Sequence, residues 1–270
     1  MHLSRRALLG LLAVSACSRV TPEPKVVKGT TRLVEAYGRT PRQKGEWWVP
    51  TADGPLPLVV LVHGGYWRDA YDLTLEDAVA ADLAGKGFLV WNIDYAPSSD
   101  PWPATLHDAA AAYDFAFTGR YADRVDKGRV AVVGHSAGGQ LSLWLASRSR
   151  LPAGAPGAGT HVVPALAVPQ APVASFRHAI ELGLGSGAVA ALLQGTEHLP
   201  LADPLSLVPS GVRTVIVHGV DDEIVPMSQS EDYVAASPST RLVKVPGDHF
   251  THLDPSSEAW AQALKALSAL

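Results

Sequence analysis

Residues 129–138 read RVAVVGHSAG and carry the strongest indication of the fold. Its apolar first half predicts a buried strand, and a helix-like segment follows at 139–146. Glycines at 134 and 138 flank Ser136 and permit a turn sharp enough to hold the serine strained and exposed. This strand–turn–helix setting predicts a nucleophilic Ser136; the alternative is a glycine-rich turn without chemistry.

Apolar runs alternate with helix-period stretches along the rest of the chain, which predicts an α/β fold with a mostly parallel sheet and helices on both faces. The expected strands are 31–37 and 46–49 at the sheet edge, then 56–62, 87–93, 129–133, 165–168, 213–218 and 240–245. The expected helices are 75–84, 105–117, 139–146 and 256–270. Residues 175–210 break the pattern, with a helix-like stretch at 178–193, and we expect them to form a small cap or loop insertion over the site rather than a second domain.

The length and composition suit one globular α/β domain, at 31–270. The chain has 270 residues, of which 47% are hydrophobic and 18% charged. A formal net charge of −4 argues against nucleic acid as the main partner. We expect a small-molecule ester or amide substrate, and no cofactor; the oligomeric state stays open.

The N-terminus reads as an export signal. Arg5 and Arg6 precede a short apolar run, which is too short for a membrane-spanning helix. Residues 14–17 read VSAC, a pattern similar to a bacterial lipobox, and the paired arginines resemble a twin-arginine signal. We expect a signal peptide at 1–16, lipidation of Cys17, a tether at 17–30 and a membrane-anchored protein on the periplasmic or cell-surface side. An ordinary cleaved signal with an incidental cysteine is the alternative.

A serine hydroxyl becomes a good nucleophile only when a base takes its proton and an acid orients that base. The expected strand at 213–218 leads to two adjacent carboxylates, Asp221 and Asp222, and the last strand leads to His249 and His252. The residues alone leave both choices open. The two histidines lack a compact third ligand, so no metal site is expected.

The expected strand at 56–62 runs into the sequence HGGYW at 63–67. Glycines let the backbone approach a substrate without an intervening side chain, as an oxyanion hole of backbone N–H groups requires. We assign the hole to Gly64, Gly65 and Ala137, with Tyr66 as an alternative donor. His63 is expected to hold the loop in place.

Tyr66 and Trp67 are candidates for the substrate pocket, and a packing role is the alternative for both. Their aromatic rings follow the glycines directly, so they could line a site for an acyl or aryl group at its mouth.

These motifs, in this order, resemble the HGG-type esterases of the α/β-hydrolase superfamily over residues 45–265. The resemblance places the triad acid at Asp222, within HGVDDEIVP at 218–226, and the base at His249, which Phe250 follows. Residues 94–97 (DYAP), 102–104 (WPA) and Asp108 are similar to a pattern of hormone-sensitive-lipase-type esterases, except that Ala96 replaces an arginine. The resemblance implies the α/β-hydrolase fold and hydrolysis of carboxylic esters through an acyl-enzyme.

HGGYW at 63–67 resembles the HGGxW motif of kynurenine formamidases more closely. An arylformamidase acting on N-formylkynurenine is therefore the alternative function. A serine peptidase is disfavoured, because this length leaves no room for a propeller or a large gating domain. The remote alternative is a non-enzymatic surface lipoprotein that kept the fold and lost the chemistry.

Overall fold

The computed structural model describes residues 29–160 and 162–270. The expected signal peptide, Cys17 and nearly all of the tether lie outside these residues, and the first strand begins at Thr30. The strands are β1 Thr30–Ala36, β2 Lys44–Pro50, β3 Leu56–Val62, β4 Leu89–Ile93, β5 Val125–His135, β6 Leu166–Gln170, β7 Arg213–Gly219 and β8 Arg241–Val245. The α-helices are α1 Asp77–Gly85, α2 Ala104–Phe115, α3 Ala137–Ala146, α4 Phe176–Glu181, α5 Ala188–Leu193, α6 Leu199–Ala202, α7 Ser228–Ala236 and α8 Glu258–Leu267.

The strands form one sheet in the order β1-β2-β4-β3-β5-β6-β7-β8. The pairs β1–β2 and β2–β4 are antiparallel and the rest are parallel, so the mostly parallel sheet predicted from the sequence is confirmed. One detail was wrong: β2 is not an edge strand, because β1 and β4 flank it and residues 45–50 are buried.

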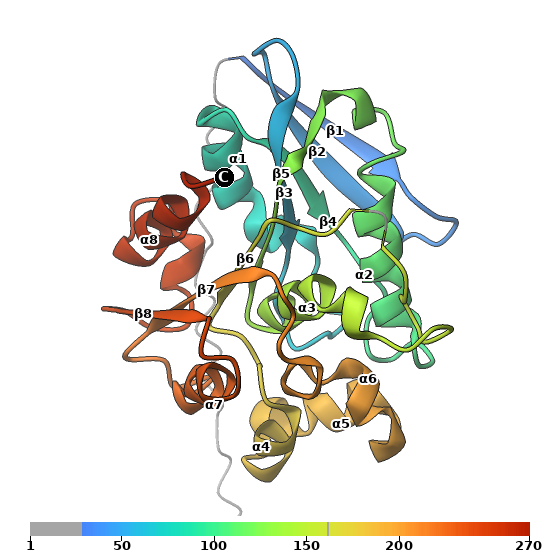
Figure 1. Cartoon of the computed structure of the whole chain (residues 1–270), viewed down its shortest axis with the longest axis vertical. Coiled ribbons are helices and arrows are strands. Elements are labelled where there is room, and N and C mark those ends of the chain that lie inside the picture. The colour runs from blue at the N-terminus through green and yellow to red at the C-terminus, as the bar shows by residue number, and fades with distance from the viewer. Residues whose placement is uncertain (1–28, 161) are drawn as a thin grey trace, which may run out of the picture.

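Helices cover both faces of the sheet, as expected (Figure 1). Helices α1 and α8 bury their apolar side chains on one face, where Trp260 and Leu83 pack against Val59 and Val133. Helices α2, α3 and α7 cover the other face, and α3 lies against β5 and β6. A strand that is buried on both faces reads as a continuous apolar run, which is why β3 and β5 were recognisable from the sequence.

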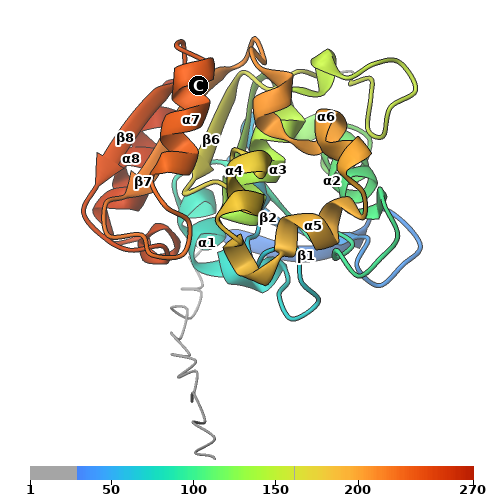
Figure 2. The ribbon, with the colours of Figure 1, turned by 90° about the horizontal axis from the view of Figure 1, so that it is seen from below.

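Residues 175–210, called the cap segment below, hold three short helices rather than one long one. The expected helix-like stretch at 178–193 is divided into α4 and α5 by Gly183, Gly185 and Gly187, all with positive φ. Such φ values end a right-handed helix. The helices α4, α5 and α6 lie together at the lower end of the molecule in Figure 1 and face the viewer in Figure 2.

Helix α7 was not expected from the sequence. Its buried residues are Gln229, Ser230 and Tyr233, so it lacks the apolar stripe by which an amphipathic helix is recognised. Within the described ranges, none of the helices is long and apolar enough to cross a membrane.

Candidate active site

Ser136 lies in the sharp turn between β5 and α3, with φ 57° and ψ −115°. This left-handed conformation costs a non-glycine residue about 1–3 kcal/mol. The surrounding structure imposes it, since a Cβ at Gly134 would lie 2.2 Å from the Gly138 carbonyl oxygen and a Cβ at Gly138 would lie 2.0 Å from that of Val62. The strained turn agrees with the expectation, but the expected exposure is wrong, because Ser136 is only 2% exposed. Its side chain makes no capping bond to α3.

Asp222 and His249 form a buried pair at the ends of neighbouring strands. His249 Nδ1 lies 2.7 Å from Asp222 Oδ2. The other oxygen of Asp222, Oδ1, accepts the backbone N–H groups of Ile224 and Val225 at 2.9 and 2.8 Å. The carboxylate is therefore held at both oxygens, in the position that orients an imidazole base.

The surroundings of Asp222 keep its carboxylate ionised. Burial alone would raise its pKa, but hydrogen bonds from the His218 and His249 side chains and from the Val225 N–H outweigh burial and hold the pKa below its ordinary value. A negative charge at this place stabilises the positive charge that His249 gains when it accepts a proton.

The loop that carries His249 is bonded to the residue before Ser136. His135 Nε2 donates to the His249 carbonyl oxygen at 2.7 Å, and the two rings lie 4.5 Å apart. The structure thus brings Ser136, His249 and Asp222 to the same edge of the sheet, although they are 113 residues apart at most along the 270-residue chain.

Asp221 and His252, the alternative acid and base, lie in different environments. Asp221 is exposed, and its carboxylate contacts the Gly247 N–H at 3.4 Å. His252 is fully buried, and neither ring nitrogen has a hydrogen-bond partner. Burial and repulsion from His218 and His249 lower the pKa of His252 to about 3, so it stays neutral. Asp222 is hydrogen-bonded to His249 and not to His252.

The glycine loop after β3 packs directly against Ser136. A Cβ at Gly64 would lie 3.1 Å from the Ser136 Cβ and 2.9 Å from the His135 carbonyl oxygen. Gly65 has φ 107°, and a Cβ there would meet the Tyr71 side chain at 2.5 Å. Only glycine fits at both positions. Ala137, the third predicted donor, is the first residue of α3, where N–H groups have no intrahelical acceptor.

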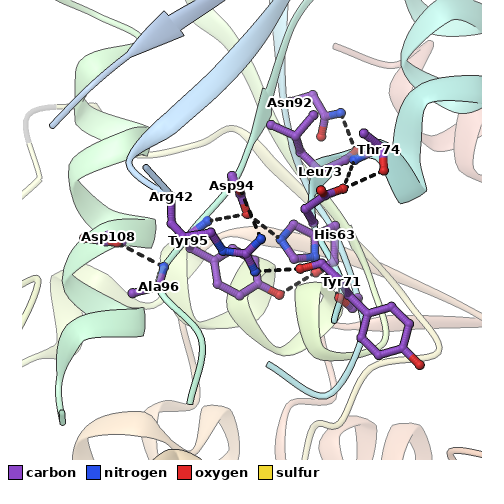
Figure 3. Close-up of polar contacts among 12 residues, drawn as sticks. Arg42, His63, Tyr71, Leu73, Thr74, Asn92, Asp94, Tyr95, Ala96 and Asp108 are labelled. Carbon is purple, nitrogen blue, oxygen red and sulfur yellow. Dashed lines mark hydrogen bonds and ion pairs between the residues drawn. The ribbon is translucent and has the colours of Figure 1, made fainter. Parts of the chain in front are cut away.

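His63 holds this loop from its first residue, as Figure 3 shows. Its ring is stacked on Tyr95 with centroids 4.2 Å apart, Nε2 lies 3.2 Å from Asp94 Oδ1, and Nδ1 lies 2.7 Å from the Gly64 carbonyl oxygen. The Tyr95 hydroxyl donates to the His63 carbonyl oxygen at 2.8 Å. These bonds are directed at Asp94 and the loop rather than at Asp222, which agrees with the expected holding role.

Sequence reasoning missed Arg42 as part of this network. Ala96 stands where the resembling esterases have an arginine, and its N–H donates to Asp108 Oδ2 at 3.0 Å. Arg42, from the β1–β2 turn, lies 3.5 Å from Asp94 Oδ2 and donates to the Tyr71 carbonyl oxygen at 2.6 Å (Figure 3). No pattern in the sequence links residue 42 to residue 94, so only the fold could reveal this contact.

Tyr66 and Trp67 both have positive φ, but their side chains go to different places. The Tyr66 hydroxyl donates to the Ile224 carbonyl oxygen at 3.0 Å, two residues after Asp222. Burial and the nearby Asp222 raise the pKa of Tyr66 to about 12, so it stays protonated and can donate. A Cβ at Gly185, in the cap segment, would lie 2.7 Å from the Tyr66 ring. Tyr66 therefore connects the glycine loop, the Asp222 loop and the cap segment.

Trp67 lies in the core. It is 1% exposed, its Nε1 donates to Gln140 Oε1 at 3.2 Å, and its ring meets Phe176 edge-on with centroids 5.7 Å apart. These contacts join the glycine loop to α3 and α4. Trp67 thus has the packing contacts that were the alternative to a place at the mouth of the site.

Two family models match this chain. The model of the prolyl oligopeptidase family matches residues 103–241, just over half of the chain, and the BD-FAE model matches residues 48–152. The two matched ranges together include Gly64, Ser136 and Asp222.

Curated relatives resemble part of the chain. Carboxylesterase NlhH of Mycobacterium tuberculosis (strain CDC 1551 / Oshkosh) is 36% identical over 113 residues, which cover 41% of this chain and 35% of the relative. Carboxylic ester hydrolase LipN of Mycobacterium tuberculosis (strain ATCC 25618 / H37Rv) is 36% identical over 125 residues, 45% of this chain and 33% of the relative. The match thus spans about a third of the length of these relatives.

Solved structures share the fold over nearly the whole chain. A truncated carbohydrate esterase from gut microbiota superposes with a TM-score of 0.80 at 18% identity and covers 91% of this chain and 98% of that one. Esterase B from Lactobacillus Rhamnosis (HN001) gives a TM-score of 0.77 at 18% identity, with 92% and 88% covered. These neighbours confirm the predicted α/β-hydrolase fold.

Proposed function

This chain belongs to the prolyl oligopeptidase family and has the α/β-hydrolase fold, and from this premise we propose that it is a serine hydrolase that cleaves carboxylic esters of small to medium substrates. The observation that carries the proposal is the 2.7 Å bond between His249 Nδ1 and Asp222 Oδ2, at the same sheet edge as the strained turn at Ser136.

In the proposed mechanism, the Ser136 hydroxyl attacks the ester carbonyl while His249 Nε2 accepts its proton. Asp222 stabilises the resulting imidazolium. The N–H groups of Gly64, Gly65 and Ala137 stabilise the oxyanion. His249 then gives the proton to the leaving alcohol, and water, activated by His249, hydrolyses the acyl-enzyme and restores Ser136.

The choice of ester over other acyl compounds is supported by the curated relatives, which are named as carboxylesterases and esterases. An aryl formamide is the second candidate substrate, because residues 63–67 read HGGYW. Both compounds present a carbonyl to the same nucleophile, so one purified enzyme can be tested with both.

The first prediction is that Ser136→Ala lowers ester turnover by at least about 10⁴-fold, because the nucleophile is lost. The measurement combines labelling by a fluorophosphonate with hydrolysis of a panel of p-nitrophenyl esters, N-formylkynurenine and a p-nitroanilide peptide. Ser142→Ala is the matched control, since Ser142 is a buried serine of α3 whose hydroxyl bonds to the Gly139 carbonyl oxygen at 2.8 Å.

Wild-type turnover of esters, lost in Ser136→Ala and kept in Ser142→Ala, is the expected result. Hydrolysis that persists in Ser136→Ala contradicts the assignment of the nucleophile. A wild-type protein that neither reacts with the fluorophosphonate nor turns over any substrate would favour the non-enzymatic lipoprotein. Preference for N-formylkynurenine would identify the arylformamidase.

We also propose that the enzyme is exported and held at a membrane by a lipid on Cys17. The support is the sequence of residues 4–17, with paired arginines, a short apolar run and a lipobox-like end.

A further inference from the structure

His218 is the second-to-last residue of β7, and its side chain lies in the protein interior beside Asp222. Its side chain is fully buried. Nε2 lies 2.9 Å from the Val225 carbonyl oxygen and 3.3 Å from Asp222 Oδ2, and Nδ1 lies 2.6 Å from the Ser230 hydroxyl oxygen. Ser230 is a buried residue of α7. All polar atoms of this imidazole therefore have partners.

These partners determine which nitrogen of His218 carries the proton. A carbonyl oxygen and a carboxylate accept hydrogen bonds but do not donate them, so Nε2 must carry the hydrogen. Nδ1 of the neutral ring is then an acceptor, and the Ser230 hydroxyl is its donor.

The same geometry completes the set of donors around the Asp222 carboxylate. Oδ1 accepts two backbone N–H groups, from Ile224 and Val225, and Oδ2 lies 2.7 Å from His249 Nδ1. The same Nε2–H of His218 that donates to the Val225 carbonyl oxygen at 2.9 Å also lies 3.3 Å from Oδ2, so it adds a second, longer donor contact to this oxygen. A carboxylate with this many donors has its plane and its charge defined before substrate binds.

We propose that His218 is a positioning residue that holds Asp222 toward His249, and that Ser230 fixes the tautomer of His218 for this task. This rests on the proposed function, since it takes Asp222 as the triad acid. The donor from His218 withdraws electron density from the carboxylate. It thereby limits how strongly Asp222 attracts the proton on His249, and it keeps that proton available for the leaving alcohol.

Two substitutions of His218 separate this role from packing. The amide nitrogen of glutamine in His218→Gln reaches the place of Nε2 and keeps a donor for Asp222. The amide of asparagine in His218→Asn lies at the place of Nδ1, so it keeps Ser230 but leaves Asp222 without this donor. Both variants are neutral and polar, so they test the donor rather than the charge of the ring.

We expect His218→Asn to lower kcat about 10- to 100-fold with KM nearly unchanged, as the loss of one charge-assisted hydrogen bond predicts. The acid limb of kcat/KM should move to higher pH, because a carboxylate with one donor fewer attracts the proton on His249 more strongly. His218→Gln should keep most of the turnover and the wild-type pH profile. Rates are expressed per site labelled by a fluorophosphonate, which removes the effect of misfolded protein.

Ser230→Ala tests the second half of the proposal without touching His218. It should lower kcat several-fold and move the acid limb in the same direction. Its matched control is Ser147→Ala, since Ser147 is also fully buried and its hydroxyl donates to the Leu143 carbonyl oxygen at 2.8 Å. The control should keep the wild-type pH profile.

Equal effects of His218→Asn and His218→Gln, or an unmoved acid limb in His218→Asn, would overturn the role of His218. An effect of Ser147→Ala as large as that of Ser230→Ala would overturn the role of Ser230. Failure of the proposed function is a different result, because the wild-type protein then shows no fluorophosphonate labelling at Ser136.

Discussion

Two buried carboxylates, Asp222 and Glu76, lie in opposite environments. Asp222 receives backbone donors on Oδ1 and an imidazole donor on Oδ2, and these hold its pKa low. Glu76, just before α1, is fully buried, and neither of its oxygens has a hydrogen-bond partner. Burial and the neighbouring Asp77 raise the pKa of Glu76 to about 8. The environment of Asp222 favours its charged form, and the environment of Glu76 favours its neutral form.

Glu76 should make the protein less stable as the pH rises. In the unfolded chain it loses its proton near its ordinary pKa of 4.5, but in the folded protein only near pH 8. Between these values the native state binds more protons, so its stability is fully present below about pH 4.5 and falls as the pH rises to about 8. Glu76→Gln removes this dependence.

We expect Glu76→Gln to gain stability relative to the wild type as the pH rises. The free energy of unfolding of the variant minus that of the wild type should be about 1–3 kcal/mol larger at pH 8 than at pH 4.5. The measurement is urea denaturation at several pH values. Asp82→Asn is a control, since Asp82 is a partly exposed acid of the following helix that pairs with Lys86 at 2.7 Å. A constant difference between Glu76→Gln and wild type across this range would contradict the prediction.

For single residues, the sequence could not distinguish by chemistry between two adjacent candidates for the triad acid. Asp221 and Asp222 have the same chemistry, and only the direction of each side chain, which depends on the turn after β7, separates an exposed acid from the partner of His249. The motif resemblance favoured Asp222 and His249, and the bond between them is what the structure adds. Their catalytic roles stay predictions until tested.

Among the elements, the cap segment contacts the glycine loop at Gly185 and at Phe176. The Tyr66 ring packs against Gly185, the Arg68 guanidinium donates to the Gly185 carbonyl oxygen, and the Trp67 ring meets Phe176 edge-on. Gly183 and Gly187 on either side leave open space where a Cβ would be. Changes at Gly185 should therefore reach the site through Tyr66.

Gly185→Ala is expected to displace the Tyr66 ring and to change the preference between short and long acyl chains several-fold. A methyl group there would lie 2.7 Å from the ring. Gly183→Ala is the matched control, because φ is 64° there and 58° at Gly185. Both variants lose about 1–2 kcal/mol of stability from the left-handed backbone. Equal acyl preferences in the two variants would contradict a role of this contact in selectivity.

The elements that escaped prediction share a physical cause. Helix α7 faces the core with Gln229 and Ser230, whose partners are polar groups, Ser175 N–H and His218. Buried polar side chains are stabilised by partners from elsewhere in the chain. A helix buried in this way has no hydrophobic periodicity in its sequence by which it could be predicted. The division of 178–193 into α4 and α5 likewise depends on positive φ at glycines that a helix can also tolerate.

On the scale of the whole molecule, the proposed lipid determines where the enzyme works. Cys17→Ser should abolish incorporation of a labelled fatty acid in a bacterial host and move the protein from the membrane fraction to the soluble fraction. A diacyl anchor supplies about 0.8 kcal/mol per buried CH₂ group, so its loss should be decisive. Thr21→Ala, within the tether, is the control and should stay in the membrane fraction. Unchanged membrane association of Cys17→Ser would contradict the proposal.

The fold class, the central strands of the sheet and the turn at Ser136 were predictable from the sequence. Continuous apolar runs and obligatory glycines are local properties, and a local pattern suffices to recognise them. The packed structure adds the bond between Asp222 and His249, which the motif resemblance had favoured, and it reveals the contacts of Arg42 with Asp94 and of Ser230 with His218, which no sequence pattern indicates. These contacts join residues of different elements, and their geometry exists only once the sheet and its helices have packed.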